Sequence, residues 1–95
     1  MEAIYKALND TTRRAILEFL LDGPKNAGQI ANQFDMTKPS ISHHLDLLKQ
    51  ANLVESAKKG QFIEYILNKQ GFEPINDWFI PFRNHFEFPK PKIRL

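Results

Sequence analysis

Residues 26–51, NAGQIANQFDMTKPSISHHLDLLKQA, contain two helical patterns separated by a very short turn. Asn26 is a predicted N-cap of the first helix, and Gln29, three residues later, completes a capping box. Thr37 is a predicted N-cap of the second helix, which we expect to run to about Ala51. Two short helices joined by a tight turn are typical of a helix-turn-helix.

The second of these helices has one apolar face and one polar face. Its predicted inward face consists of Ile41, Leu45 and Leu48, which recur at helical spacing. The outward positions are polar and comprise Ser42, His43, Asp46 and Gln50, with Lys38 at the N-terminus, Ser40 on the flank and His44 near the buried edge. The exposed N-terminal half therefore offers short hydrogen-bonding groups and a cation, which suit base edges and phosphates in a DNA major groove.

The remaining sequence predicts a winged helix-turn-helix, a mainly α fold with a small β-hairpin. The expected elements outside the helix pair are helices over residues 2–8, 11–21 and 74–88, and strands over 53–56 and 61–67. Lys58, Lys59 and Gly60 are read as the hairpin turn. With Gln61, the two lysines would place a second DNA contact at the tip, against the phosphate backbone or in the minor groove.

The last predicted helix carries a continuous apolar stripe: Ile75, Trp78, Phe79, Phe82 and Phe86. Residues 72–88 hold six of the chain's eleven aromatic residues, more than a short terminal helix needs to cover a small domain. An apolar patch of this kind usually marks an interface, so we expect a homodimer through this stripe, with help from Ile4 and Leu8. Packing within the domain is the alternative.

Composition narrows the class of protein. The 95 residues fit one domain, which we place at residues 1–88 and follow with a basic tail at 89–95. The chain has no cysteine, which excludes disulfides, thiolate metal sites and cysteine nucleophiles. We expect no signal peptide and no membrane insertion, and hence a cytoplasmic protein. The net charge of +2 permits nucleic-acid binding without requiring it.

Three stretches resemble the ArsR-type winged-helix repressors. Residues 7–17 look like that family's opening helix, residues 37–49 are similar to its recognition helix, and residues 53–65 resemble its wing. The Ser-His-His-Leu run at 42–45 is the most specific part, and the likeness covers about residues 3–68. The resemblance implies a homodimeric repressor on a two-fold symmetric operator, with dimer contacts from the first and last helices. The metal-independent autorepressors of the family have the nearest pattern.

The sequence departs from the family's metal sensors in two places. Residues 26–29 carry no soft ligand where many relatives have paired cysteines. The last helix holds Asp77, His85 and Glu87 in a spacing that does not fit the family's other metal site. We therefore expect no metal and no cofactor, and by elimination a protein or small-molecule inducer.

Several alternatives stay open from the sequence. His43 could be a solvated surface histidine, Ser42 could bond only its own backbone, and the lysines could form a merely soluble turn. His44 is read as packing rather than base contact. The rival function is a winged-helix module that binds protein and not DNA, in line with Asp46 and the low net charge. An enzyme ranks third, because the sequence has no cysteine, no glycine-rich phosphate loop and no metal-ligand set.

Overall fold

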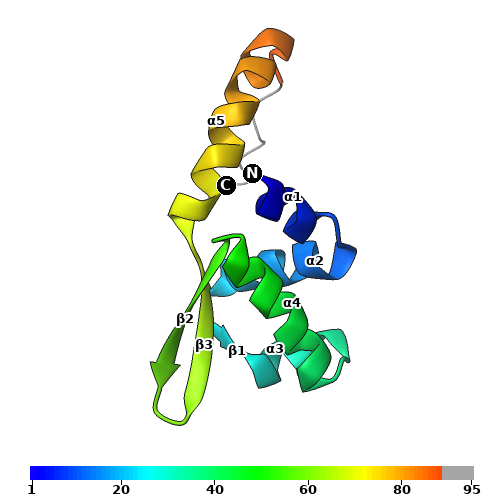
Figure 1. Ribbon diagram of the computed structural model, residues 1–95, viewed down its shortest axis with the longest axis vertical. Coiled ribbons are helices and arrows are strands. Elements are labelled where there is room, and N and C mark those ends of the chain that lie inside the picture. Colours follow the sequence, from blue (N-terminus) through cyan, green and yellow to red (C-terminus); the bar gives the residue numbers. More distant parts are fainter. Residues whose placement is uncertain (89–95) are drawn as a thin grey trace, which may run out of the picture.

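The computed structural model describes residues 1–88, and the predicted basic tail at 89–95 lies outside the described residues. The helices are α1 (Glu2–Leu8), α2 (Thr11–Phe19), the short 3₁₀ helix η1 (Leu20–Asp22), α3 (Ala27–Phe34), α4 (Lys38–Gln50) and α5 (Lys69–Phe86). The strands are β1 (Lys25–Asn26), β2 (Val54–Lys59) and β3 (Phe62–Leu67). Figure 1 shows the resulting winged helix-turn-helix, which confirms the predicted fold class.

The predicted N-caps Asn26 and Thr37 are present, and Asp10 caps a third helix. A carboxylate oxygen of Asp10 accepts a hydrogen bond from the amide of Arg13 at 3.0 Å and begins α2. Asn26 and Gln29 form the reciprocal capping box of α3, with both bonds at 2.8 Å. The hydroxyl of Thr37 accepts from the amide of Ser40 and fixes the start of α4. Because each cap satisfies amides that have no partner within the helix, it sets where the helix begins.

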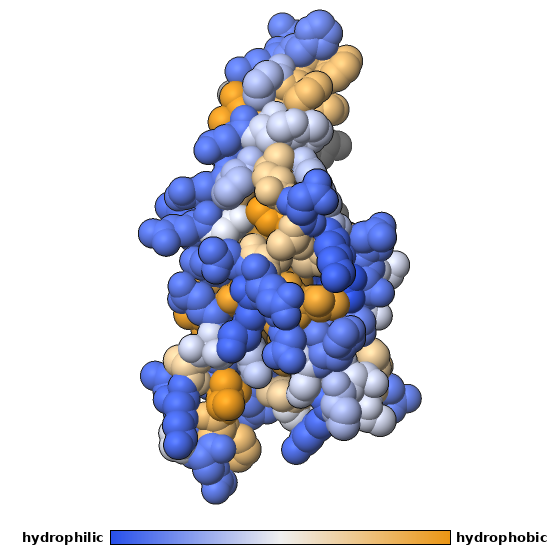
Figure 2. All heavy atoms as spheres, in the orientation of Figure 1, coloured by the Kyte–Doolittle hydropathy of each residue, from blue (hydrophilic) through white to orange (hydrophobic). Residues whose placement is uncertain are grey.

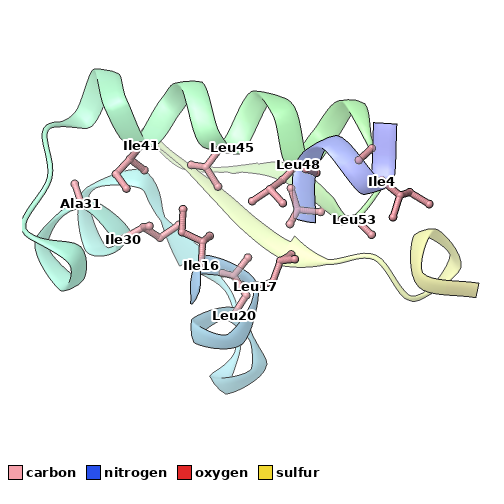
Figure 3. Close-up of a cluster of buried hydrophobic side chains, with 13 residues drawn as sticks. Ile4, Ile16, Leu17, Leu20, Ile30, Ala31, Ile41, Leu45, Leu48 and Leu53 are labelled. Atoms are coloured by element: carbon pink, nitrogen blue, oxygen red, sulfur yellow. The ribbon is translucent and has the colours of Figure 1, made fainter. Parts of the chain in front are cut away.

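The core lies between α4 and the helices that precede it in the chain, α1, α2 and α3 (Figure 3). Ile41, Leu45 and Leu48 are fully buried, as their spacing predicted. They pack with residues of α1, α2 and α3 in one cluster, whose fully buried members include Ile16 and Ile30. Burial of these side chains orients α4, so its opposite face is left to solvent.

The sheet differs from the predicted two-stranded ribbon. It has three antiparallel strands in the order β1-β3-β2, because Lys25 and Asn26 pair with Tyr65 and Glu64. The predicted position of the hairpin turn, Lys58 to Gly60, is also wrong, because the turn consists of Gly60 and Gln61. Gly60 has φ +61°, a conformation that glycine adopts without strain.

The two wing lysines therefore lie in a strand and not in the turn. Lys58 pairs with Ile63, and Lys59 pairs with Phe62. Because successive residues of a strand point to opposite faces, the two side chains leave opposite faces of the hairpin. Lys58 shares its face with Ile63 and Tyr65.

Helix α5 begins five residues before the predicted start and continues through Pro74 and Pro81 as one element. Its first turn is held against the end of α4. The side-chain amide of Asn68 donates to the carbonyl of Asn52 at 3.0 Å. A Cβ at Gly71 would lie 1.7 Å from that carbonyl oxygen, so only glycine permits this approach.

The elements are arranged along the length of the molecule. The hairpin tip and the helix pair α3–α4 occupy one end, and α5 projects from the other end as an arm (Figure 1). Among residues 1–88, no helix combines the length and the hydropathy needed to cross a membrane. The front of α4 and the apolar stripe of α5 therefore lie toward opposite ends of the molecule.

Candidate nucleic-acid interface

The N-terminal half of α4 is exposed and free of acidic residues in its first turn. Lys38, Ser40, Ser42 and His43 all have exposed side chains, as predicted. Ser40 is partly engaged locally, because its hydroxyl oxygen accepts from the hydroxyl of Thr37 at 3.0 Å. Its own proton remains able to donate to a partner. Asp46 is exposed as well, but it lies farther along the helix, beyond the first turn.

A groove of about 290 Å³ separates the front of α4 from the hairpin. It is lined by Asn26, Ala27, Gly28, Lys38, Ser42, Gln61, Phe62, Ile63 and Tyr65. The groove therefore brings together three of the predicted DNA contacts, Lys38, Ser42 and Gln61. Neither Lys58 nor Lys59 is among these lining residues. Lys58 shares a hairpin face with Ile63 and Tyr65, and Lys59 shares the opposite face with Phe62, which also lines the groove.

The side chain of Lys38 lies beside Gly28, at the start of α3. A Cβ at position 28 would lie 3.6 Å from Cε of Lys38 and 3.9 Å from its ammonium nitrogen. The lysine side chain thus crosses close to the α3 backbone, at the floor of the groove. This contact joins α3 to the start of α4 and has no local signal in the sequence.

His44 does not belong to the exposed face, because its side chain is only 15% exposed. It faces Asp10 and Arg13, with Nδ1 3.9 Å from a carboxylate oxygen and 3.2 Å from a guanidinium nitrogen. Burial lowers the pKa of His44 below its usual value of 6.5; the guanidinium adds to this effect, and the carboxylate opposes it. The predicted packing role of His44 fits this position, although its partners are side chains and not a carbonyl.

Arg13 and Arg14 are structural residues that the sequence analysis quoted only as part of the family resemblance. Arg13 donates to the carbonyls of Ala7 and Lys6 at 2.8 and 3.0 Å, and Arg14 donates to that of Leu8 at 2.6 Å. The last carbonyls of a helix have no partner within it and carry partial negative charge, so they favour cations. This role could have been predicted from the sequence, because two arginines follow shortly after the end of a seven-residue helix.

The aromatic stripe of α5 is exposed over most of its length. Trp78, Phe79, Phe82 and Phe86 are each between 41% and 62% exposed. Figure 2 shows hydrophobic side chains along this arm and again over the hairpin. Ile75 packs partly against the core, and Ile4 is buried in it, with 6% of its surface exposed. Ile4 therefore has little surface left for a partner chain.

Within residues 1–88, no cluster of three histidine or acidic side chains has the geometry to hold a metal ion. Asp77, His85 and Glu87 lie along or at the end of α5, and they do not form such a cluster.

Comparisons with known proteins place the chain among bacterial regulators. Residues 10–56 match the family described as "Bacterial regulatory protein, arsR family". The chain is 46% identical over 84 residues to the transcriptional repressor SdpR of Bacillus subtilis (strain 168). The aligned region spans 88% of this chain and 93% of that protein.

Solved structures agree with this placement. The crystal structure of the ArsR family transcriptional regulator RHA00566 superposes with a TM-score of 0.78 at 29% identity, over 94% of this chain and 92% of that one. The homodimeric winged helix-turn-helix DNA-binding domain Mb0332 from Mycobacterium bovis superposes with a TM-score of 0.72 over 98% and 86% of the two chains. Its identity of 22% supports the fold alone.

Proposed function

This chain belongs to the ArsR family of bacterial regulatory proteins, and from that membership we propose that it is a transcriptional repressor that binds double-stranded DNA as a homodimer. The observation that carries the proposal is the front of α4, which is exposed, has no acidic residue in its first turn and lies beside a hairpin that carries Lys58 and Lys59 near its tip. The matching family and the relative SdpR are both described as regulators, which argues against a catalytic role.

In this proposal α4 is the recognition helix and enters the major groove. Ser40, Ser42 and His43 would contact base edges, because short hydrogen-bonding side chains suit that distance. Lys38, at the start of the helix, would contact a phosphate, together with the free amides of the first turn. Base contacts would supply the choice of sequence, and phosphate contacts would supply much of the affinity.

The wing would supply the second contact. Gln61 lines the groove beside α4, Lys58 shares a hairpin face with Ile63 and Tyr65, and Lys59 points to the opposite face. A thin hairpin with cationic side chains can lie against the backbone or enter the minor groove. We expect these contacts to be largely independent of sequence.

We infer that two copies of the chain associate through α5. It exposes four large aromatic side chains in one stripe, Trp78, Phe79, Phe82 and Phe86, and a contiguous apolar patch of this kind usually marks an interface. A two-fold dimer would place the two recognition helices about 34 Å apart, in successive major grooves on one face of the DNA. The operator is then expected to be an imperfect palindrome.

Fluorescence anisotropy with the protein's own promoter DNA tests this function. We expect specific binding that weakens steeply with salt, and a loss of roughly tenfold or more in His43→Ala, since a good base contact discriminates by about 1–3 kcal/mol. Gln50→Ala is the matched control, because Gln50 is exposed on the same helix at its far end. Equal affinity of the wild type and His43→Ala would contradict the assignment of the contact.

One observation favours the rival function, a module that binds protein. Phe62 and Ile63 on the hairpin are each more than half exposed, and an apolar surface beside α4 could receive a partner protein. The same titration separates the two functions. If the wild type binds promoter DNA no better than a scrambled duplex, the protein-binding module becomes the better account.

A further inference from the structure

Arg13 joins three parts of the fold with one guanidinium group. Its Nε and Nη2 donate to the carbonyls of Ala7 and Lys6 at the end of α1, at 2.8 and 3.0 Å. Its Nη1 lies 3.2 Å from Nδ1 of His44 on α4. The main chain of Arg13 is fixed as well, because its amide donates to the capping carboxylate of Asp10. The residue therefore holds the end of α1 against the recognition helix.

The chemistry of the two groups defines the state of the imidazole. A guanidinium can only donate hydrogen bonds, so Nδ1 of His44 must be the acceptor, and the ring proton must sit on Nε2. The carboxylate of Asp10, 3.9 Å from the same nitrogen, would be a partner only if Nδ1 carried a proton. The contact with Arg13 is shorter, and the lowered pKa of His44 agrees with a neutral ring near neutral pH.

We propose that Arg13 is a positioning residue for DNA binding, which fixes the recognition helix against α1 through the unprotonated Nδ1 of His44. The proposal rests on the function proposed above. Arg13 itself faces the interior side of α4 and is not among the exposed residues of its front. Its effect on DNA would therefore pass through the orientation of α4.

Protonation of His44 should release this connection. A proton on Nδ1 would face the donor Nη1 of Arg13, so the hydrogen bond would be lost and two positive charges would meet. The charged groups that face the ring are Asp10 and Arg13 from α2 and His43 from α4 itself, while α1 contributes the carbonyls bound to Arg13. Since Asp10 would attract the new N–H, the ring would turn from Arg13 toward the carboxylate.

The first test compares Arg13→Gln with Arg14→Gln. Both variants lose one positive charge and one arginine that binds the end of α1, but only Arg13 contacts α4. We expect the affinity for promoter DNA to fall about tenfold more in Arg13→Gln than in Arg14→Gln, the loss typical of one charge-assisted hydrogen bond. Circular dichroism confirms that both variants are folded. Equal losses in the two variants would overturn the positioning role.

The second test is the pH profile of DNA affinity in the wild type and in His44→Asn. The asparagine can place an amide oxygen near the position of Nδ1, so it can accept from Arg13, and it does not titrate. We expect the two proteins to bind alike above pH 6.5, and the wild type alone to lose affinity as the pH falls through the lowered pKa of His44. Identical profiles would overturn the proposal.

A measurement without DNA separates this proposal from the proposed function. Nitrogen NMR of the imidazole in the free protein should show His44 with its proton on Nε2 at pH 7.5, in the wild type and in Arg14→Gln. A proton on Nδ1 would overturn the link to Arg13, whatever the DNA data show. Absence of specific DNA binding by the wild type would instead overturn the function and, with it, the role of Arg13 in that function.

Discussion

Asp10 performs two tasks with one carboxylate. It caps α2 through the amide of Arg13, and it lies 3.9 Å from the imidazole of His44. The hydrogen bond from that amide, followed by the positive charge of Arg13, lowers the pKa of Asp10 below 3.8, although partial burial opposes the shift. The capping role was predictable from the sequence because it is local. The contact with His44 was not, because it joins residues far apart in the chain.

Asp10→Ala should lower the free energy of unfolding by about 1 kcal/mol at neutral pH, because an N-cap of α2 is lost. Asp10→Asn should cost less, since asparagine also caps helices. The carboxylate has a lower pKa in the folded chain, so its contribution is present above pH 3.8 and is lost as the pH falls through the folded-state pKa. Urea unfolding at a series of pH values checks this. A difference between the wild type and Asp10→Ala that persists unchanged at pH 2 would contradict it.

At position 71 the fold has no room for any side chain, so the residue is glycine. A Cβ there would lie 1.7 Å from the carbonyl oxygen of Asn52 and 2.5 Å from its carbon, both backbone atoms. We expect Gly71→Ala to destabilise the protein by roughly 1–3 kcal/mol, because α5 must move away from α4. Thermal unfolding measures the change. Gln70→Ala, at the exposed neighbouring position, is the control and should change stability by less than about 0.5 kcal/mol.

At the scale of elements, the helices with strong local signals were predictable and the ones fixed by contacts were not. The cap at Thr37 and the spacing of Ile41, Leu45 and Leu48 were sufficient for α4. Strand β1 was not predicted, because two residues are too few to show the alternation of apolar and polar side chains that is typical of a strand. Only their pairing with β3 makes them a strand. The start of α5 escaped it because Gly71 and Pro74 are usually helix breakers, whereas here the contact with Asn52 requires the glycine.

The hairpin makes a separate prediction for each lysine. Lys58 shares a face with Ile63 and Tyr65, two of the residues that line the groove beside α4, and Lys59 shares the opposite face with Phe62, which also lines it. We expect Lys58→Ala to weaken binding to all DNA sequences and to reduce the salt dependence by about one phosphate contact. Lys59→Ala should have the smaller effect. Anisotropy titrations over a range of salt concentrations measure both slopes, and a larger loss in Lys59→Ala would contradict the assigned faces.

At the scale of the molecule, the account requires two copies of the chain. The stripe on α5 was predictable from its spacing, and its exposure agrees with the expected interface. The contribution expected from Ile4 finds less support, since its side chain is already buried in the core. The sequence could not separate these two cases, because an apolar residue on a helix can serve either the core or an interface.

Phe82→Asp should convert a dimer into a monomer, because the charge would be placed within the apolar stripe of α5. DNA affinity should fall with it, since each half-site would then bind one copy separately. Asn84→Asp adds the same charge away from the stripe and is the control. Sedimentation velocity checks the assembly state. A wild type that sediments as a monomer at micromolar concentration would contradict the dimer.

The central claim is that the front of α4 faces DNA, and NMR mapping of the backbone amides during titration with promoter DNA tests it most directly. We expect the largest shifts at residues 38–43 of α4 and at 58–61 of the hairpin, the two segments that flank the groove. Shifts that leave residues 38–43 unchanged while other surfaces respond would contradict the claim.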